Sequence, residues 1–167
     1  MYYSTSKFQV RFLDVSNNRL SQLTNGTLRG LEQAEVVDLS RNRIGSVHAE
    51  AFSGFHHIRE INLSYNKLRT IRNEAFRGCL TLKKLILKAA GIQHIELHAL
   101  DDFVALVELD LSDNLLVMPN SFARLIKALP AIKVLKLSGN NLVNVTRILA
   151  KKPDASLSLA PLVDLHR

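Results

Sequence analysis

The sequence predicts an α/β solenoid, in which coils of similar length stack and each coil adds one short strand to a parallel β-sheet. Three observations predict this fold. A pattern of eleven residues, L-x-x-L-x-L-x-x-N-x-L, occurs six times. Four successive steps between copies are 24 residues long, and the last is 26. The centre of each copy alternates apolar and polar residues, as a half-buried strand does. The copies begin at Val10, Ala34, Ile58, Leu82, Leu106 and Ile132.

The fifth copy shows how each coil begins. In Leu109-Asp110-Leu111 we expect the two leucines to point into the core and the aspartate to point outward. The asparagine three residues later stands where the chain turns in from the strand. A buried amide is tolerable there only if it bonds to backbone groups that would otherwise lack partners. Five copies carry this residue, at Asn18, Asn42, Asn66, Asn114 and Asn140.

The second half of each coil adds further apolar columns to the core. Two of them run through Leu28, Phe52, Phe76 and Leu100, and through Leu31, Phe55, Cys79 and Phe103. Cys79 is the only cysteine of the chain, and large apolar residues occupy its column in the other coils. This position predicts a small buried hydrophobe and not a reactive thiol.

In these residues the chain resembles the leucine-rich repeat family, and specifically its 24-residue class. The convex half of that class, A-F-x-G-x-x-x-I, is seen at Ala51-Phe52-Ser53-Gly54-Phe55 and Ala75-Phe76-Arg77-Gly78-Cys79. The resemblance covers roughly residues 10–145. It implies a horseshoe with a concave parallel β-sheet and a convex side of loops or short helices. It also implies binding and not catalysis, because the class is typical of cell-surface and secreted recognition proteins.

The ends of the chain bear on its domain organisation. We expect residues 1–167 to form one leucine-rich repeat domain, with repeat cores starting near 10, 34, 58, 82, 106 and 132 and a further one near 160. Members of the extracellular class usually carry cysteine-rich caps, and this chain departs from that pattern. Because uncapped repeats would leave an apolar face at each end, we interpret the chain as an internal fragment of a longer receptor or adhesion protein. An intracellular scaffold or regulatory subunit is the alternative.

Charge and targeting signals leave the partner open. The formal net charge is +7 and the pI is near 9.8, which suits a polyanion such as heparin or an acidic partner. The alternative is that lysines and arginines fill solvated repeat positions, as at Arg19, Arg43 and Lys67. Residues 1–9 show no signal peptide, and no apolar run reaches the roughly 18 residues of a membrane span. A protein ligand remains the expected partner, with no specific nucleic acid.

Three sequons are candidate glycosylation sites on the secretory route. They are Asn25-Gly26-Thr27, Asn62-Leu63-Ser64 and Asn144-Val145-Thr146. Asn62 falls on an outward strand position, where Asn-Leu-Ser mostly echoes the repeat itself. We therefore rank Asn25 first and Asn144 second.

The fourth repeat departs most from the pattern. It replaces the outward aspartate with Ile86, the following serine with Lys88 and the turn asparagine with Ala90. We expect a gap in the column of amides here, filled by water or by a shifted turn at Gly91. The repeat also predicts a protein-binding centre on the concave face, formed by Arg59, Tyr65, Lys83, Lys84, Ile86 and Lys88. Alternatively, these cations take part in a salt-bridged lattice with Glu60, Glu108, Asp110 and Asp113.

The remaining features add one expected helix and no catalytic site. Residues 121–129 follow a helical pattern with Ser121 as the cap, and residues 160–165 resemble the start of a seventh strand. His94 and His98 have a spacing that can bind metal on a helix, but no cysteine or carboxylate set joins them. No phosphate loop and no G-x-S-x-G motif occurs. We expect neither an enzyme nor a cofactor or metal site.

Overall fold

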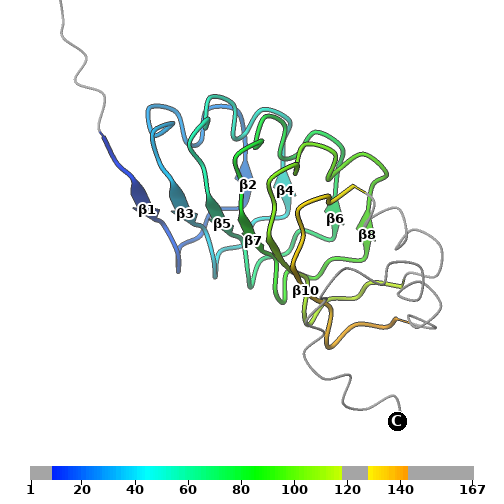
Figure 1. The fold of residues 1–167 in the computed structure, drawn as a ribbon. Helices are drawn as coiled ribbons and strands as arrows, with labels where there is room; N and C mark the ends of the chain where they lie inside the picture. Colours follow the sequence, from blue (N-terminus) through cyan, green and yellow to red (C-terminus); the bar gives the residue numbers. More distant parts are fainter. Residues whose placement is uncertain (1–8, 118–127, 143–167) are drawn as a thin grey trace, which may run out of the picture.

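The computed structural model describes residues 9–117 and 128–142, and these form stacked coils around one elongated core. Each described coil contributes one three-residue strand to a parallel sheet of six strands, in the order β1-β3-β5-β7-β9-β10 (Figure 1). The strands are β1 (Phe12–Asp14), β3 (Val36–Asp38), β5 (Glu60–Asn62), β7 (Lys84–Ile86), β9 (Glu108–Asp110) and β10 (Val134–Lys136). The predicted solenoid with a parallel sheet is confirmed.

The register of the sheet follows the repeat. Equivalent residues of successive coils lie opposite one another, as Ile61 and Leu85 do across β5 and β7. The leucine that follows each strand continues the ladder, because Leu63 N–H donates to the Ile86 carbonyl at 2.8 Å. Leu87 N–H likewise donates to the Asp110 carbonyl at 2.8 Å. Each coil therefore stacks directly on the preceding one, and the equivalent leucines of all coils face the same core.

A second set of short strands lies beside the first, on the flank of the coils (Figure 1). They are β2 (Gln22–Leu23), β4 (Ser46–Val47), β6 (Thr70–Ile71) and β8 (His94–Ile95). The sequence predicts an apolar column at Leu23, Val47 and Ile71 but no strands there. The flank strands form two separate pairs, β2-β4 and β6-β8, with no pairing between β4 and β6.

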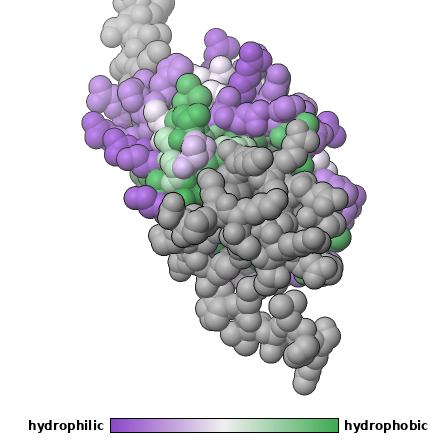
Figure 2. All heavy atoms as spheres, turned by 45° about the vertical axis from the view of Figure 1, so that its right-hand side comes forward, coloured by the Kyte–Doolittle hydropathy of each residue, from purple (hydrophilic) through white to green (hydrophobic). Residues whose placement is uncertain are grey.

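The convex half of the coils is packed by a row of phenylalanines. Phe52 and Phe76 stack with ring centroids 5.8 Å apart, and Phe76 and Phe103 follow at 5.4 Å. All three are fully buried. Cys79 is buried beside them, as predicted, and desolvation raises the pKa of its thiol to about 12. Hydrophilic residues cover most of the coloured surface, and hydrophobic residues show in a few places among them (Figure 2).

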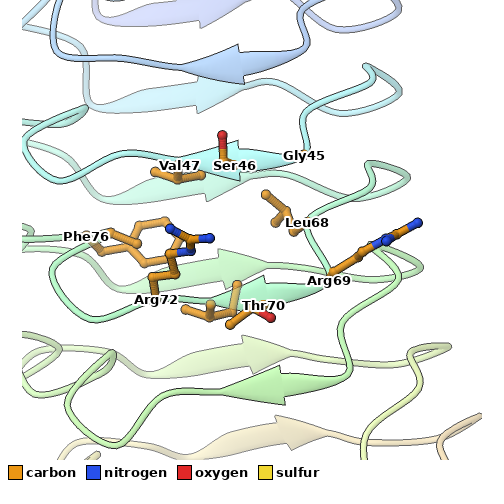
Figure 3. A pocket seen from close by; sticks show the side chains of 10 residues that line it. Gly45, Ser46, Val47, Leu68, Arg69, Thr70, Arg72 and Phe76 are labelled. Atoms are coloured by element: carbon orange, nitrogen blue, oxygen red, sulfur yellow. The ribbon is translucent and has the colours of Figure 1, made fainter.

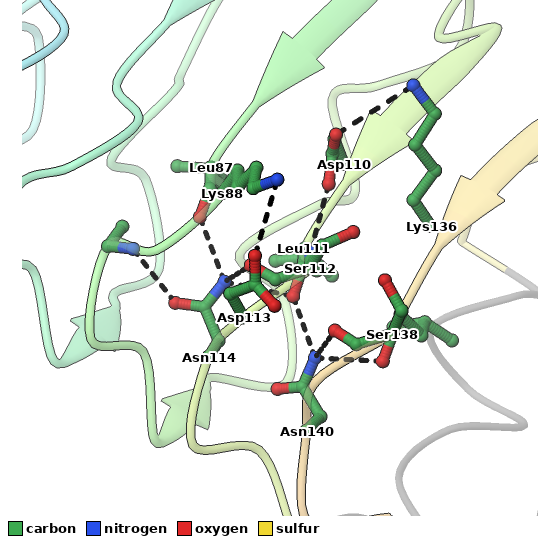
Figure 4. Close-up of polar contacts among 12 residues, drawn as sticks. Leu87, Lys88, Asp110, Leu111, Ser112, Asp113, Asn114, Lys136, Ser138 and Asn140 are labelled. Carbon is green, nitrogen blue, oxygen red and sulfur yellow. Dashed lines mark hydrogen bonds and ion pairs between the residues drawn. The ribbon is translucent and has the colours of Figure 1, made fainter. Parts of the chain in front are cut away.

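The asparagine column joins neighbouring coils through the backbone. Asn66 accepts a hydrogen bond from Ile44 N–H at 2.9 Å and donates to the carbonyls of Leu39, Leu63 and Ser64. Asn114 and Asn140 make equivalent contacts two and three coils further on (Figure 4). This arrangement confirms the predicted role of the amides, which satisfy backbone groups that the turn would leave buried without partners.

Ala90 interrupts this column in the expected way. No amide is available to Leu68 N–H, which donates instead to the Ala90 backbone carbonyl at 2.9 Å. Gly91 follows with a φ of +70°, a conformation that glycine adopts without steric cost. A shifted turn therefore takes over one bond of the missing side chain.

The convex side consists of turns in the residues that the structure describes, and no helix occurs among them. Of the two predicted alternatives, loops and short helices, the loops are found there. The helix expected over residues 121–129 and the strand expected near 160 lie outside the described residues, apart from Ala128 and Leu129 at the end of that helix. Leu129 is buried in the core.

Candidate protein-binding surface on the concave sheet

The structure brings the six predicted surface residues together on and beside β5 and β7. We call this group the basic concave surface; it consists of Arg59, Tyr65, Lys83, Lys84, Ile86 and Lys88. Backbone bonds align the two coils, since Lys83 N–H donates to the Arg59 carbonyl and Tyr65 N–H to the Lys88 carbonyl, both at 2.9 Å. Lys84 and Ile86 occupy the two outward positions of β7.

Acidic residues of neighbouring coils pair with three of the four cations. Arg59 Nε lies 3.3 Å from Glu35 Oε2, and Lys84 Nζ lies 3.2 Å from Glu60 Oε1. Lys88 Nζ lies 3.3 Å from Asp113 Oδ2 (Figure 4), and this hydrogen bond raises the pKa of Lys88. Water screens such exposed pairs, so they orient the side chains more than they stabilise the fold.

Lys83 differs from the other cations of the surface. Its side chain is exposed, and within the described residues no carboxylate lies within ion-pair distance of it. Lys83 therefore carries the least neutralised charge of the basic concave surface. A carboxylate of a ligand could reach this ammonium without displacing an internal partner.

Tyr65 and Ile86 supply the apolar part of the surface. Tyr65 is 45% exposed, and the guanidinium carbon of Arg41 lies 4.7 Å from the centre of its ring. Such a cation–π contact is worth about 0.5–1 kcal/mol at an exposed site. Ile86 lies between Asn62 and Asp110 on the neighbouring strands. Tyr65 and Ile86 are thus the two residues of the basic concave surface that carry no charge.

Ion pairs of the same kind join the next two coils. Lys136 Nζ lies 2.8 Å from Glu108 Oε1 and 3.8 Å from Asp110 Oδ2. The hydrogen bond to Glu108 raises the pKa of Lys136. Of the four acids in the predicted lattice, Glu60 and Asp113 pair with cations of the basic concave surface, whereas Glu108 and Asp110 pair with Lys136 outside it.

The cation–π contact of Arg41 with Tyr65 was not predicted from the sequence. Arg41 and Tyr65 occupy equivalent positions, one residue before the asparagine, and both have positive φ. The same conformation recurs at Asn17, Ala89, Asp113 and Gly139. Asparagine, aspartate and glycine favour this left-handed conformation, so their presence in the column was the available signal.

The three sequon asparagines differ in their surroundings. Asn25 is exposed in a turn and donates to Glu50 Oε2 at 3.2 Å. Asn62 lies within the concave sheet, where it donates to Asp38 and accepts from Ser64. Asn144 lies outside the described residues. Attachment of a glycan to Asn62 would require these internal bonds to break, whereas Asn25 needs to release only one exposed contact.

Metal ligands and membrane-spanning helices are the remaining features to consider in the described part of the chain. No group of three or more histidine, cysteine or acidic side chains there could hold a metal ion. The same residues include no helix that is long and apolar enough to cross a bilayer.

Comparison with known families decides where this fold belongs. The profile described as Leucine rich repeat matches residues 9–68 and 57–116. The chain belongs to the leucine-rich repeat family. A comparison with curated protein sequences found no significant match.

Solved leucine-rich repeat structures resemble the chain over most of its length. The structure of TLR13 in complex with ssRNA13 is 32% identical, with a TM-score of 0.68 over 75% of this chain. The Drosophila Toll–Spatzle complex is 17% identical, with a TM-score of 0.67 over 75% of this chain. Human 5T4, also named trophoblast glycoprotein, is 20% identical, with a TM-score of 0.62 over 82% of this chain. The last two likenesses concern the fold alone.

The share of each relative that is covered is small for the first two. The chain spans 18% of the TLR13 chain and 17% of the Toll chain. It spans 61% of the 5T4 chain. What these proteins bind is therefore a property of much longer molecules.

Proposed function

We propose that this chain is a protein-binding leucine-rich repeat module of a cell-surface or secreted recognition receptor, and that residues 1–167 are one domain of a longer protein. The basic concave surface is its contact site. The observation that carries the proposal is an exposed tyrosine and a half-buried isoleucine within a rim of oriented charges on a rigid sheet. Interfaces typically combine such an apolar centre with a polar rim.

The charge lattice supports a protein ligand over a polyanion at this surface. Three of its cations already have carboxylate partners, so a polyanion would have to compete with them. A protein ligand of mixed charge can instead match both signs of the lattice. Electrostatic complementarity of this kind provides specificity and accelerates association more than it adds affinity.

The relatives support a ligand-binding role on the same fold. TLR13 was solved with a single-stranded RNA and Toll with the protein Spatzle. We take binding of a protein ligand to be the function here, because Tyr65 is the only aromatic residue of the basic concave surface and a single ring offers few bases a stacking platform.

The test reverses two charges at the centre of the surface. Secreted ectodomains that bind the immobilised chain are selected by display, and their affinities are measured by biolayer interferometry. The double variant Lys84→Glu, Lys88→Glu should weaken binding at least tenfold, because it places carboxylates beside Glu60 and Asp113 and repels an acidic ligand group.

A matched control separates this effect from net charge. The variant Arg29→Glu, Arg77→Glu changes the charge by the same amount on exposed convex positions, and we expect it to alter affinity by less than about twofold. Circular dichroism confirms that both variants fold. Unchanged affinity in the folded Lys84→Glu, Lys88→Glu protein would remove the basic concave surface as the contact site.

A further inference from the structure

Within the described part of the chain, the break in the flank sheet leaves two backbone amides without hydrogen-bond partners. The coil with β4 bonds to the coil with β2 through Gly45 N–H to the Ser21 carbonyl at 2.8 Å and His48 N–H to the Leu23 carbonyl at 2.9 Å. The coil with β8 makes the two equivalent bonds to the coil with β6, because Gln93 N–H donates to the Arg69 carbonyl and Glu96 N–H donates to the Ile71 carbonyl. Between β4 and β6 the equivalent donors would be the amides of residues 69 and 72, and neither makes a hydrogen bond to any described residue.

The shifted turn at Ala90 explains where the break lies. In the other coils the asparagine side chain of the next coil accepts a hydrogen bond from one backbone N–H, that of Leu20, Ile44, Ile92 or Leu116. Leu68 N–H is held by the Ala90 carbonyl instead, and the next residue, Arg69, has a φ of +56°. At the equivalent positions Ser21, Gly45 and Gln93, φ is not positive. The missing asparagine side chain at position 90 therefore changes the backbone direction just before β6. As a result, the backbone N–H of Arg69 turns away from β4.

A slot of about 220 Å³ occupies the break, between β4 and β6. Gly45, Ser46 and Val47 line one side, and Arg69, Thr70 and Arg72 line the other (Figure 3). The side chains of Arg69 and Arg72 lie toward opposite ends of the slot (Figure 3). A space of this size is smaller than a drug-sized ligand needs, but it accommodates one or two polar groups.

The slot is basic, and its charges are not neutralised. Arg69 and Arg72 are both exposed, and within the described residues neither has an acidic partner. Two nearby acids are already engaged, since Glu74 pairs with Arg77 at 3.8 Å and Glu96 accepts from Asn73 N–H at 2.7 Å. The flank thus differs from the concave sheet, where most of the cations are paired.

We propose that this slot binds an acidic peptide segment of a partner protein, with one carboxylate held at the Arg69 end and another at the Arg72 end, each beside a backbone amide that lacks a partner among the described residues. Backbone N–H groups beside a guanidinium form charge-assisted hydrogen bonds with a carboxylate. Among the described residues no group donates to the carbonyls of Gly45 and Val47. The evenly spaced N–H groups of an extended peptide match such a strand edge, which favours a peptide over a sulfated glycan. This site is separate from the basic concave surface, and its proposal stands without it.

The test is a titration of the full chain followed by amide nuclear magnetic resonance. The probe is the capped tetrapeptide Asp-Glu-Asp-Glu, with Asn-Gln-Asn-Gln as the neutral control and a heparin tetrasaccharide as the competing class. We expect the acidic peptide alone to shift the Arg69 and Arg72 amide signals. Absence of these shifts, or shifts produced only by the heparin fragment, would overturn the proposal.

Two variants connect the binding to this slot. Arg69→Gln, Arg72→Gln should weaken peptide binding about tenfold, the effect of losing a charged hydrogen bond. Arg43→Gln, Lys67→Gln removes the same charge from exposed turn positions outside the slot and should change binding less than threefold. Equal losses in the two double variants would reduce the effect to net charge and overturn the assignment.

Ala90→Asn tests the slot without replacing any residue that lines it. It should restore the amide bond to Leu68 N–H, return Arg69 to negative φ and let the Arg69 and Arg72 amides pair with β4. Their hydrogen exchange should then slow and peptide binding should fall about tenfold. Undiminished binding in a variant whose amides have become protected would overturn the proposal.

Discussion

Replacing Asn114 with alanine tests whether the buried amides hold the coils together. Asn114 is 3% exposed and accepts from Ile92 N–H at 2.9 Å and Ala90 N–H at 3.1 Å. It also donates to the carbonyls of Leu87, Leu111 and Ser112. Alanine keeps the Cβ but leaves two buried donors unpaired, at about 1–3 kcal/mol each. We expect the free energy of unfolding to fall by about 3 kcal/mol.

Asn18 provides a matched control in the first coil. It is exposed, and in the described residues it makes only local bonds, to the carbonyls of Val15 and Ser16. Asn18→Ala removes no acceptor from a buried donor, so its cost should stay below about 1 kcal/mol.

The assay is urea denaturation followed by circular dichroism, with hydrogen exchange of the Ile92 amide as the local measurement. Asn114→Ala should lower the denaturation midpoint and speed exchange of this amide, while Asn18→Ala should leave the exchange unchanged. If the two variants differ by less than 1 kcal/mol, the amides do not join the coils as argued.

Two further predictions concern the buried thiol and the exposed sequon. Because burial raises the pKa of Cys79 from 9.0 to about 12, a disulfide reagent at pH 9 should label the chain only in urea. Between these pH values only the thiol of the unfolded chain ionises, so the free energy of unfolding should decline as pH rises from 9 to 12. When the chain is secreted from animal cells, mass spectrometry should find glycan on Asn25, removed by Asn25→Gln, and none on Asn62; an unmodified Asn25 would favour the intracellular alternative.

The core and the concave sheet could be predicted because they depend on residue type at a fixed period. Leu63, Leu87 and Leu111 recur at 24-residue steps, and the structure places each on the next rung of one ladder. The partners of the concave cations followed from the same spacing, since Glu60 and Lys84 are equivalent residues of adjacent coils. Wherever the pattern is regular, one coil predicts its neighbours.

The flank could not be predicted in this way, because its structure depends on backbone conformation. Two-residue strands such as β4 and β6 are too short to show an alternation. The left-handed conformation of Arg69 has no signature in its residue type, and it follows from an alanine 21 residues later in the chain. The sequence indicates that an amide is missing at Ala90, but not which neighbouring strand loses its partner.

Both proposed contact sites originate in the one repeat that breaks the pattern. Its outward substitutions, Ile86 and Lys88, build the concave site, and its inward substitution, Ala90, opens the flank slot one coil away. The two effects are separable, because Lys84→Glu, Lys88→Glu leaves the turn intact and Ala90→Asn changes no residue of the basic concave surface. Asn66 and Asn114, in the coils on either side of Ala90, each bond to buried backbone groups of two coils. Ala90 cannot make these bonds, so the fourth repeat lacks contacts that join the coils elsewhere, and Ala90→Asn tests whether the slot that results is used for binding.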